Sequence, residues 1–113
     1  MDPTAFEDLA EKTLESLFDA IDDAIGDDAD VDFDNGILTV ELEDGRQYVI
    51  NKHAPNQQIW LSSPISGAAH YAYDKASSTW VSTRTSDVLM DVLSAEIGQI
   101  AGREVNLVAM PFL

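Results

Sequence analysis

Apolar residues near the N-terminus recur at the spacing of one face of an α-helix. Most of these apolar positions have another three or four residues away, and they are Phe6, Leu9, Leu14, Leu17, Ile21, Ala24 and Ile25. Thr4 is a suitable N-cap, because Glu7 three residues later completes a capping box. Gly26 is a suitable stop. The pattern predicts an amphipathic helix over residues 4–25.

After Asp27 the period of the apolar positions changes from about 3.6 to 2, which is typical of half-buried strands. The alternating positions are Val31 and Phe33, then Leu38, Val40 and Leu42, then Tyr48 and Ile50. Asn35-Gly36 and Asp44-Gly45 between them are hairpin signals. Further strands are predicted over residues 57–62, 69–74 and 79–84. This part of the chain therefore reads as a meander of five or six antiparallel strands.

Helical spacing returns over residues 87–101, where Asp87 or Ser86 can cap the start and Gly102 the end. The tail over residues 105–113 is apolar, and we expect it to pack against the helices. Two helices that flank a meander can lie together on one sheet face. The pattern predicts one α+β domain over residues 1–113, a two-layer α-β sandwich whose second sheet face is open to solvent.

Residues 56–63 place a large apolar side chain on the polar side of a strand. Ile59 and Leu61 alternate with Gln58, Trp60 and Ser62, so Trp60 faces away from the core if Ile59 faces it. The phase of the preceding strand places Asn51 and His53 on the same open face. Aromatic side chains anchor many interfaces, so we interpret Trp60 as a docking residue.

The net charge of −15 is concentrated in the N-terminal part of the chain. Residues 1–44 contain sixteen of the 21 acidic residues and only one of the six basic residues, Lys12, whereas residues 45–113 are balanced. General surface acidity would be spread over the whole chain, so this pattern requires a local reason. The scarcity of Lys and Arg argues against nucleic acid as a partner.

The acidic residues of the predicted first helix form a stripe away from its apolar face. At about 100° per residue, five of them fall within about 80° of one another: Asp8, Glu11, Glu15, Asp19 and Asp22. Asp30, Asp32 and Asp34 continue the negative charge on one side of the first strand. Two interpretations stay open, a solvated face that favours solubility and a ridge that binds hard cations weakly.

One alternative within this acidic stretch is a calcium loop. Asp30, Asp32 and Asp34 would take positions 1, 3 and 5 of an EF-hand, with Glu41 at position 12. However, position 6 is Asn35 rather than the glycine that the sharp turn needs. The strict alternation favours a hairpin instead.

Several classes of chemistry lack their residues or motifs. The absence of cysteine excludes disulfides, Cys-ligated zinc and thiol catalysis. The sequence contains no P-loop and no G-x-G-x-x-G, and neither His53 nor His70 belongs to a metal motif. No apolar run is long enough to span a membrane, and the N-terminus lacks an apolar signal core. The residues alone indicate no enzyme, and we expect a cytoplasmic bacterial protein or a trimmed mature form.

Four segments resemble the frataxin family, including its bacterial CyaY-type members. They are "DVDFDNGILTVEL", "YVINK", "PNQQIWLSSPISG" and Trp80-Val81. The third is the most specific and is closer to the mitochondrial form than to many bacterial ones. The resemblance covers nearly the whole chain and agrees with the predicted order of elements.

The resemblance implies an iron-binding accessory protein of iron–sulfur cluster assembly, a regulator or iron chaperone that delivers or stores iron. Members bind Fe²⁺ and Fe³⁺ weakly and dock on the complex of cysteine desulfurase and scaffold protein. No organic cofactor and no membrane or nucleic-acid partner is implied. We expect a monomer, and the family's weak ferroxidase activity and iron-induced oligomers are left open.

The family's functional positions can be carried over to this chain. The iron ridge falls on Glu11, Glu15, Asp19, Asp22, Asp23, Asp30 and Asp32, with Glu7, Asp8, Asp27, Asp28 and Asp34 as additions. The partner surface falls on Asn51, Gln58, Ile59 and Trp60. His70 stands where the eukaryotic form has a basic residue. The alternative functions are a Ca²⁺, Mg²⁺ or Mn²⁺ buffer and an acidic interaction module without a metal role.

Overall fold

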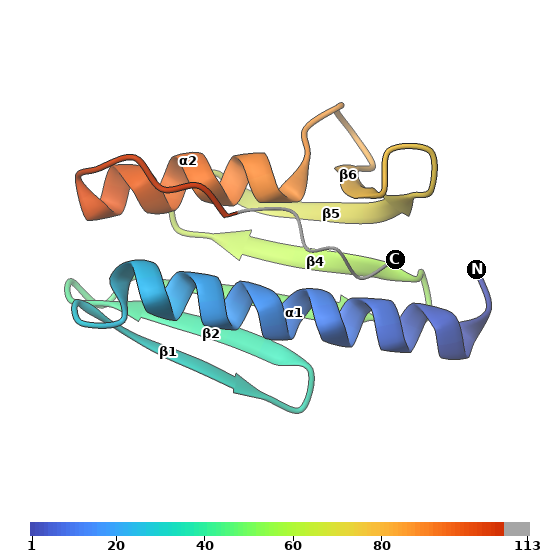
Figure 1. Ribbon diagram of the computed structural model, residues 1–113, viewed down its shortest axis with the longest axis horizontal. Coiled ribbons are helices and arrows are strands. Elements are labelled where there is room, and N and C mark those ends of the chain that lie inside the picture. Colours follow the sequence, from blue (N-terminus) through green and yellow to red (C-terminus); the bar gives the residue numbers. More distant parts are fainter. Residues whose placement is uncertain (108–113) are drawn as a thin grey trace.

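The computed structural model describes residues 1–107. Six strands form one antiparallel sheet in chain order, and two helices run side by side across one of its faces (Figure 1). The elements are α1 (Pro3–Ile25), β1 (Ala29–Asp34), β2 (Ile37–Leu42), β3 (Gln47–His53), β4 (Gln58–Ser63), β5 (Gly67–Asp74), β6 (Thr79–Ser82) and α2 (Leu89–Ala101). The architecture confirms the predicted α+β sandwich of two helices on an antiparallel meander, and of the five or six strands expected, six are formed.

The core lies between the helices and the sheet, because alternate strand residues point toward the helices. The fully buried side chains include Phe6, Leu14, Leu17, Ile21, Leu38, Tyr48, Ile50, Ile59, Leu93 and Ile97. Trp80 of β6 contacts Phe6 and Tyr73 edge-on. Its indole N–H donates to Thr13 of α1 at 3.1 Å. This hydrogen bond links β6, an edge strand of the sheet, to α1.

The β1–β2 turn is formed as the sequence predicts. Asn35 and Gly36 have φ values of 52° and 74°, and Asp34 pairs directly with Ile37. Two left-handed residues in a two-residue loop suit the twist of a hairpin. Residues 30 and 32 lie in the paired strand. The EF-hand alternative is therefore wrong.

Both predicted helix starts are wrong by one or two residues. α1 begins at Pro3, because proline suits the first helical position and Asp2 caps it by accepting a hydrogen bond from the Ala5 amide at 3.1 Å. α2 begins at Leu89 without a side-chain cap. Val88 is held extended by its bridge to Val81. The predicted ends at Gly26 and Gly102 are confirmed.

The bounds of three strands also differ from the predicted ones. β4 runs one residue later than predicted, because Gln57 adopts a left-handed φ of 52° in the preceding turn. β5 begins at Gly67. β6 ends at Ser82 instead of residue 84, because the Ser82 hydroxyl accepts hydrogen bonds from Arg84 and Thr85 and turns the chain.

A buried carboxylate ties α2 to the sheet. Glu96 accepts hydrogen bonds from the hydroxyl groups of Tyr48 at 2.8 Å, Ser63 at 2.5 Å and Ser66 at 2.7 Å. Burial raises the pKa of Tyr48 far above its usual range, and the bond to Glu96 adds to this. Four side chains from two strands, a loop and a helix are therefore joined at one point.

Part of the predicted tail packing is observed. Leu107 is buried, and its amide donates to the Ser94 hydroxyl of α2 at 2.9 Å. Val105 also packs against the core. Residues 108–113 of the predicted tail lie outside the described part. Among residues 1–107, neither helix has the length and apolar character that a membrane crossing needs.

Candidate functional site: an acidic ridge and an open sheet face

The predicted acidic stripe of α1 lies on the surface. Asp8, Glu15, Asp19, Asp22 and Asp23 are all exposed. Several are like-charged neighbours four residues apart, which disfavours the helix. Asp22 and Asp23 also lie in the last turn, where the helix dipole disfavours anions. The stripe therefore costs stability.

Phe18 shows which side of α1 carries these carboxylates. Its ring packs on Phe33 of β1, with ring centroids 6.4 Å apart. Glu15 precedes Phe18 by three residues and Asp22 follows it by four, so both are its neighbours on the helix surface. The stripe therefore runs along the side of α1 next to β1, which is an edge strand of the sheet.

Lys52 of β3 neutralises the N-terminal end of this stripe. Its ammonium group lies 2.5 Å from the Glu7 carboxylate and 3.3 Å from that of Glu11. These ion pairs raise the pKa of Lys52, the hydrogen bond to Glu7 most of all. Glu11, a predicted iron ligand, therefore already has a cationic partner. Within residues 1–107 these are the two ion pairs that α1 makes.

The carboxylates of β1 point to the other face of the sheet. Val31 and Phe33 pack toward the helices, so Asp30, Asp32 and Asp34 face the open side and are exposed. The helix and strand carboxylates thus meet at the same edge of the molecule, one set on each side of β1. The predicted single ridge is therefore divided between the two sides of β1.

The ridge contains no preformed cage. Nowhere in the described chain do three or more Asp, Glu or His side chains converge on a point that could hold one ion. Exposed carboxylates still suit hard, oxygen-preferring cations. Their arrangement favours binding at several weak, exchangeable positions.

The open sheet face carries an aromatic stack that the sequence analysis did not anticipate. Trp60 lies on this face as predicted, but its indole stacks on His53 and on His70. The ring centroids are 3.7 Å and 4.1 Å apart, and the interplanar angles are 8° and 10°. The indole N–H donates to the Gln58 side chain at 2.8 Å. Trp60 is consequently half-buried.

The register explains this stack. Trp60 pairs directly with Asn51 on β3 and with His70 on β5, whereas His53 pairs with Gln58. The pairing of β3, β4 and β5 places both histidines beside the tryptophan. The stack is therefore predictable from the strand register and not from any single segment.

One residue predicted for the partner surface is on the wrong side of the sheet. Ile59 is fully buried and faces the helices, because it alternates with Trp60 along β4. Its side chain packs in the core and is not available to a partner. Asn51, Gln58, Trp60 and His70 lie on the open face and are partly exposed.

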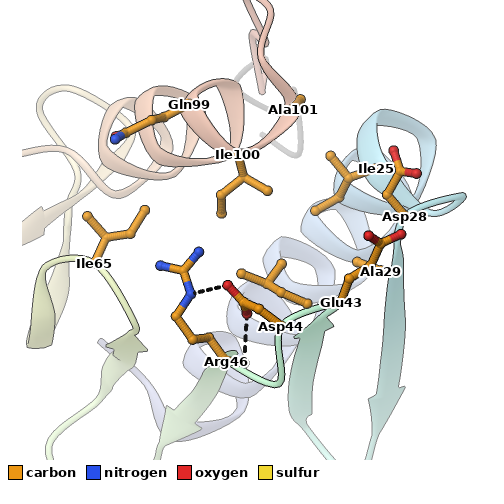
Figure 2. Close-up of a pocket in the computed structure, with 11 residues that line it drawn as sticks. Ile25, Asp28, Ala29, Glu43, Asp44, Arg46, Ile65, Gln99, Ile100 and Ala101 are labelled. Atoms are coloured by element: carbon orange, nitrogen blue, oxygen red, sulfur yellow. Dashed lines mark hydrogen bonds and ion pairs between the residues drawn. The ribbon is translucent and has the colours of Figure 1, made fainter.

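A cavity of about 520 Å³ lies where the C-terminal ends of both helices meet the β2–β3 turn. Figure 2 shows Ile25, Ile65 and Ile100 around it, with Arg46 bonded to Asp44 at its rim. The Arg46 bonds lower the pKa of Asp44. None of the predicted iron or partner residues lines this cavity, although Asp28, a possible addition to the ridge, does.

Comparison with known proteins identifies close relatives. A family model described as the frataxin-like domain matches residues 1–103. The mitochondrial frataxin homolog of Schizosaccharomyces pombe is 40% identical over 87% of this chain, which spans 65% of that protein. The iron–sulfur cluster assembly protein CyaY of Thioalkalivibrio sulfidiphilus is 38% identical over 87% of this chain and 92% of its own length. The chain thus spans slightly less than two thirds of the mitochondrial relative.

Solved structures have the same fold. Frataxin from Psychromonas ingrahamii is 28% identical, with a TM-score of 0.82 over 96% of this chain and 100% of that chain. Trimeric frataxin from Saccharomyces cerevisiae, complexed with ferrous iron, is 34% identical. It has a TM-score of 0.73 over 84% of this chain and 87% of its own. Both support the two-layer sandwich.

Proposed function

The chain belongs to the frataxin family, and from that premise we propose that it is an iron-binding accessory protein of iron–sulfur cluster assembly. Relatives named as iron–sulfur cluster assembly proteins support the pathway. A yeast relative complexed with ferrous iron supports the metal. The bacterial relatives favour a cytoplasmic location.

The observation that carries the proposal is the exposed carboxylate stripe beside the β1 edge. Its repulsion destabilises α1, and its basic neighbour Lys52 reaches only the N-terminal end. A function that needs cations accounts for a stripe that destabilises its own helix. We assign iron to Glu15, Asp19, Asp22 and Asp23 on the helix side, and to Asp30 and Asp32 on the strand side. Glu11 contributes less, because Lys52 competes for it.

We further propose that the open sheet face docks on the complex of cysteine desulfurase and scaffold protein. This docking face consists of Asn51, Gln58, Trp60 and His70. Ile59 is not part of it, because its side chain is buried in the core. The face lies behind the helices, so a partner could bind there while the α1 stripe stays in solvent. Docking would let the protein regulate sulfur transfer where the cluster forms.

Iron binding is tested by anaerobic Fe²⁺ titration of the ¹⁵N-labelled protein. Amide signals of residues 8–34 should broaden or shift, and those of α2 should not. The variant Glu15→Gln/Asp19→Asn/Asp22→Asn should lose most of this response. The matched control Asp87→Asn/Asp91→Asn/Glu104→Gln removes the same number of exposed charges elsewhere and should keep it. An equal loss in both variants would show that the Fe²⁺ response depends on net charge and not on the position of the ridge.

Two further measurements separate the alternative functions. A general divalent-cation buffer would bind Ca²⁺ or Mg²⁺ as tightly as Fe²⁺ and would not retain the desulfurase–scaffold complex. An acidic interaction module would retain a partner but show no ridge response to Fe²⁺. The proposed function requires both an Fe²⁺ response of the ridge and retention of the desulfurase–scaffold complex. Trp60→Ala should weaken that retention.

A further inference from the structure

Both ring faces of Trp60 are covered by imidazoles. His53 comes from the strand on one side of β4 and His70 from the strand on the other side. Because both rings lie nearly parallel to the indole, they occupy its two opposite faces. A partner that approaches the closed stack meets only the edges of the three rings. Docking on the flat indole therefore requires one imidazole to move aside.

The open-face positions next to the stack on β3, β4 and β5 are uncharged. The neighbouring open-face positions on β3, β4 and β5 are Val49, Asn51, Gln58, Ser62, Ala68 and Ala72. Lys52 points to the helix side, where it pairs with α1. The other charged groups around the stack are Asp34 on β1, Asp74 at the end of β5 and Arg84 after β6. Histidine is the side-chain type that most readily changes its charge near neutral pH, and two histidines meet in this stack.

Protonation acts on this stack in two ways. An imidazolium is attracted to the face of an indole more strongly than a neutral imidazole, so the ring is held in place. An interface formed over the stack would also have to desolvate the new charge. Both effects oppose docking on the indole, and both vanish when the imidazoles are neutral.

We propose that the His53–Trp60–His70 stack makes docking proton-sensitive: the neutral stack opens for the partner, and the protonated stack is clamped over Trp60. This inference deepens the proposed function and rests on it for the identity of the partner. It predicts that docking releases protons and weakens as the pH falls from 8.0 to 6.0.

The clamp itself can be measured in the isolated protein. A neutral, water-soluble nitroxide broadens NMR signals of accessible side chains, and Trp80, which is buried, serves as the internal control. Broadening of the Trp60 indole signals should be about two- to fivefold weaker at pH 6.0 than at pH 8.0. In His53→Gln/His70→Gln it should not depend on pH. Equal or stronger broadening at pH 6.0 in the unaltered protein would overturn the clamp.

Docking is then measured with the purified desulfurase–scaffold complex at both pH values. The double variant contains no histidine, so its pH dependence reports the partner and all groups other than these two imidazoles. Relative to it, the unaltered protein should bind several-fold more weakly at pH 6.0 than at pH 8.0, because the docked state requires neutral imidazoles. A constant ratio, or tighter relative binding at pH 6.0, would refute the proposal. Absence of binding at any pH would instead count against the proposed function, while the nitroxide result still decides the clamp.

Discussion

The hydroxyl of Tyr48 offers a sharp test of how the two layers are joined. Tyr48→Phe removes one of the three hydroxyl groups that donate to the buried Glu96 carboxylate and leaves the ring in place. A hydrogen bond to a charged group contributes about 1.5–3 kcal/mol. Ser63 and Ser66 still solvate the carboxylate, so the protein should fold. We expect the free energy of unfolding to fall by about 1.5–3 kcal/mol at pH 7.

The same hydroxyl gives the prediction a second, independent signature. The pKa of Tyr48 is raised in the folded protein, mainly by burial. A raised pKa contributes stability that is complete below the unfolded pKa of about 10 and is lost as the pH rises above it. The stability difference between the two proteins should therefore shrink by about 1.4 kcal/mol between pH 9 and pH 11. The pKa of Tyr71 is also raised by burial, so Tyr48→Phe should retain part of the alkaline loss.

Urea denaturation followed by circular dichroism at pH 7, 9 and 11 provides the assay. Tyr73→Phe is the matched control, because the Tyr73 hydroxyl makes no hydrogen bond within residues 1–107, and it should change the free energy by less than about 0.5 kcal/mol. Equal effects of the two substitutions, or a Tyr48→Phe difference that stays constant up to pH 11, would show that the bond to Glu96 contributes little.

Three further substitutions test the charges of α1, each by urea denaturation. Glu15→Gln relieves like-charged pairs with Glu11 and Asp19 and should stabilise the protein by about 0.4–1 kcal/mol at low salt, a gain that disappears in high salt. Asp2→Ala removes the N-cap and should destabilise by about 1 kcal/mol; no change would mean that the cap is not formed in solution. Lys52→Met leaves the carboxylates of Glu7 and Glu11 without their cationic partner. Because all three groups are partly exposed, the free energy of unfolding should fall by no more than about 1 kcal/mol. The Fe²⁺ response of Glu11 should increase.

Local patterns predicted the elements, and contacts between elements decided what the patterns missed. The turn at Asn35 and the end of α2 at Gly102 depend on left-handed backbone preferences that a few residues settle. The start of α2 depends on a bridge between Val88 and Val81, which pairing alone creates. A search for helix caps could not detect it.

In the candidate site, too, local patterns predict some features, and others depend on contacts between elements. The acidic stripe follows from helical spacing, so its position on α1 could be predicted. The two-sided arrangement of the carboxylates and the histidine stack depend on which strands are neighbours and in what register. Glu96 shows the same limit, because a glutamate on the core side of a helix is interpretable only once its hydroxyl partners are known.

One row of cross-strand neighbours relates the two proposed surfaces. Asp34, Ile37, Asn51, Trp60 and His70 face one another in turn across five strands. At about 4.8 Å per strand, the β1 carboxylates lie roughly 15 Å from Trp60 on the same face. A partner interface of ordinary size that is centred on Trp60 would therefore reach β1. Iron held on the strand side of the ridge would then lie at the edge of the docked complex, whereas iron on the α1 side would stay in solvent.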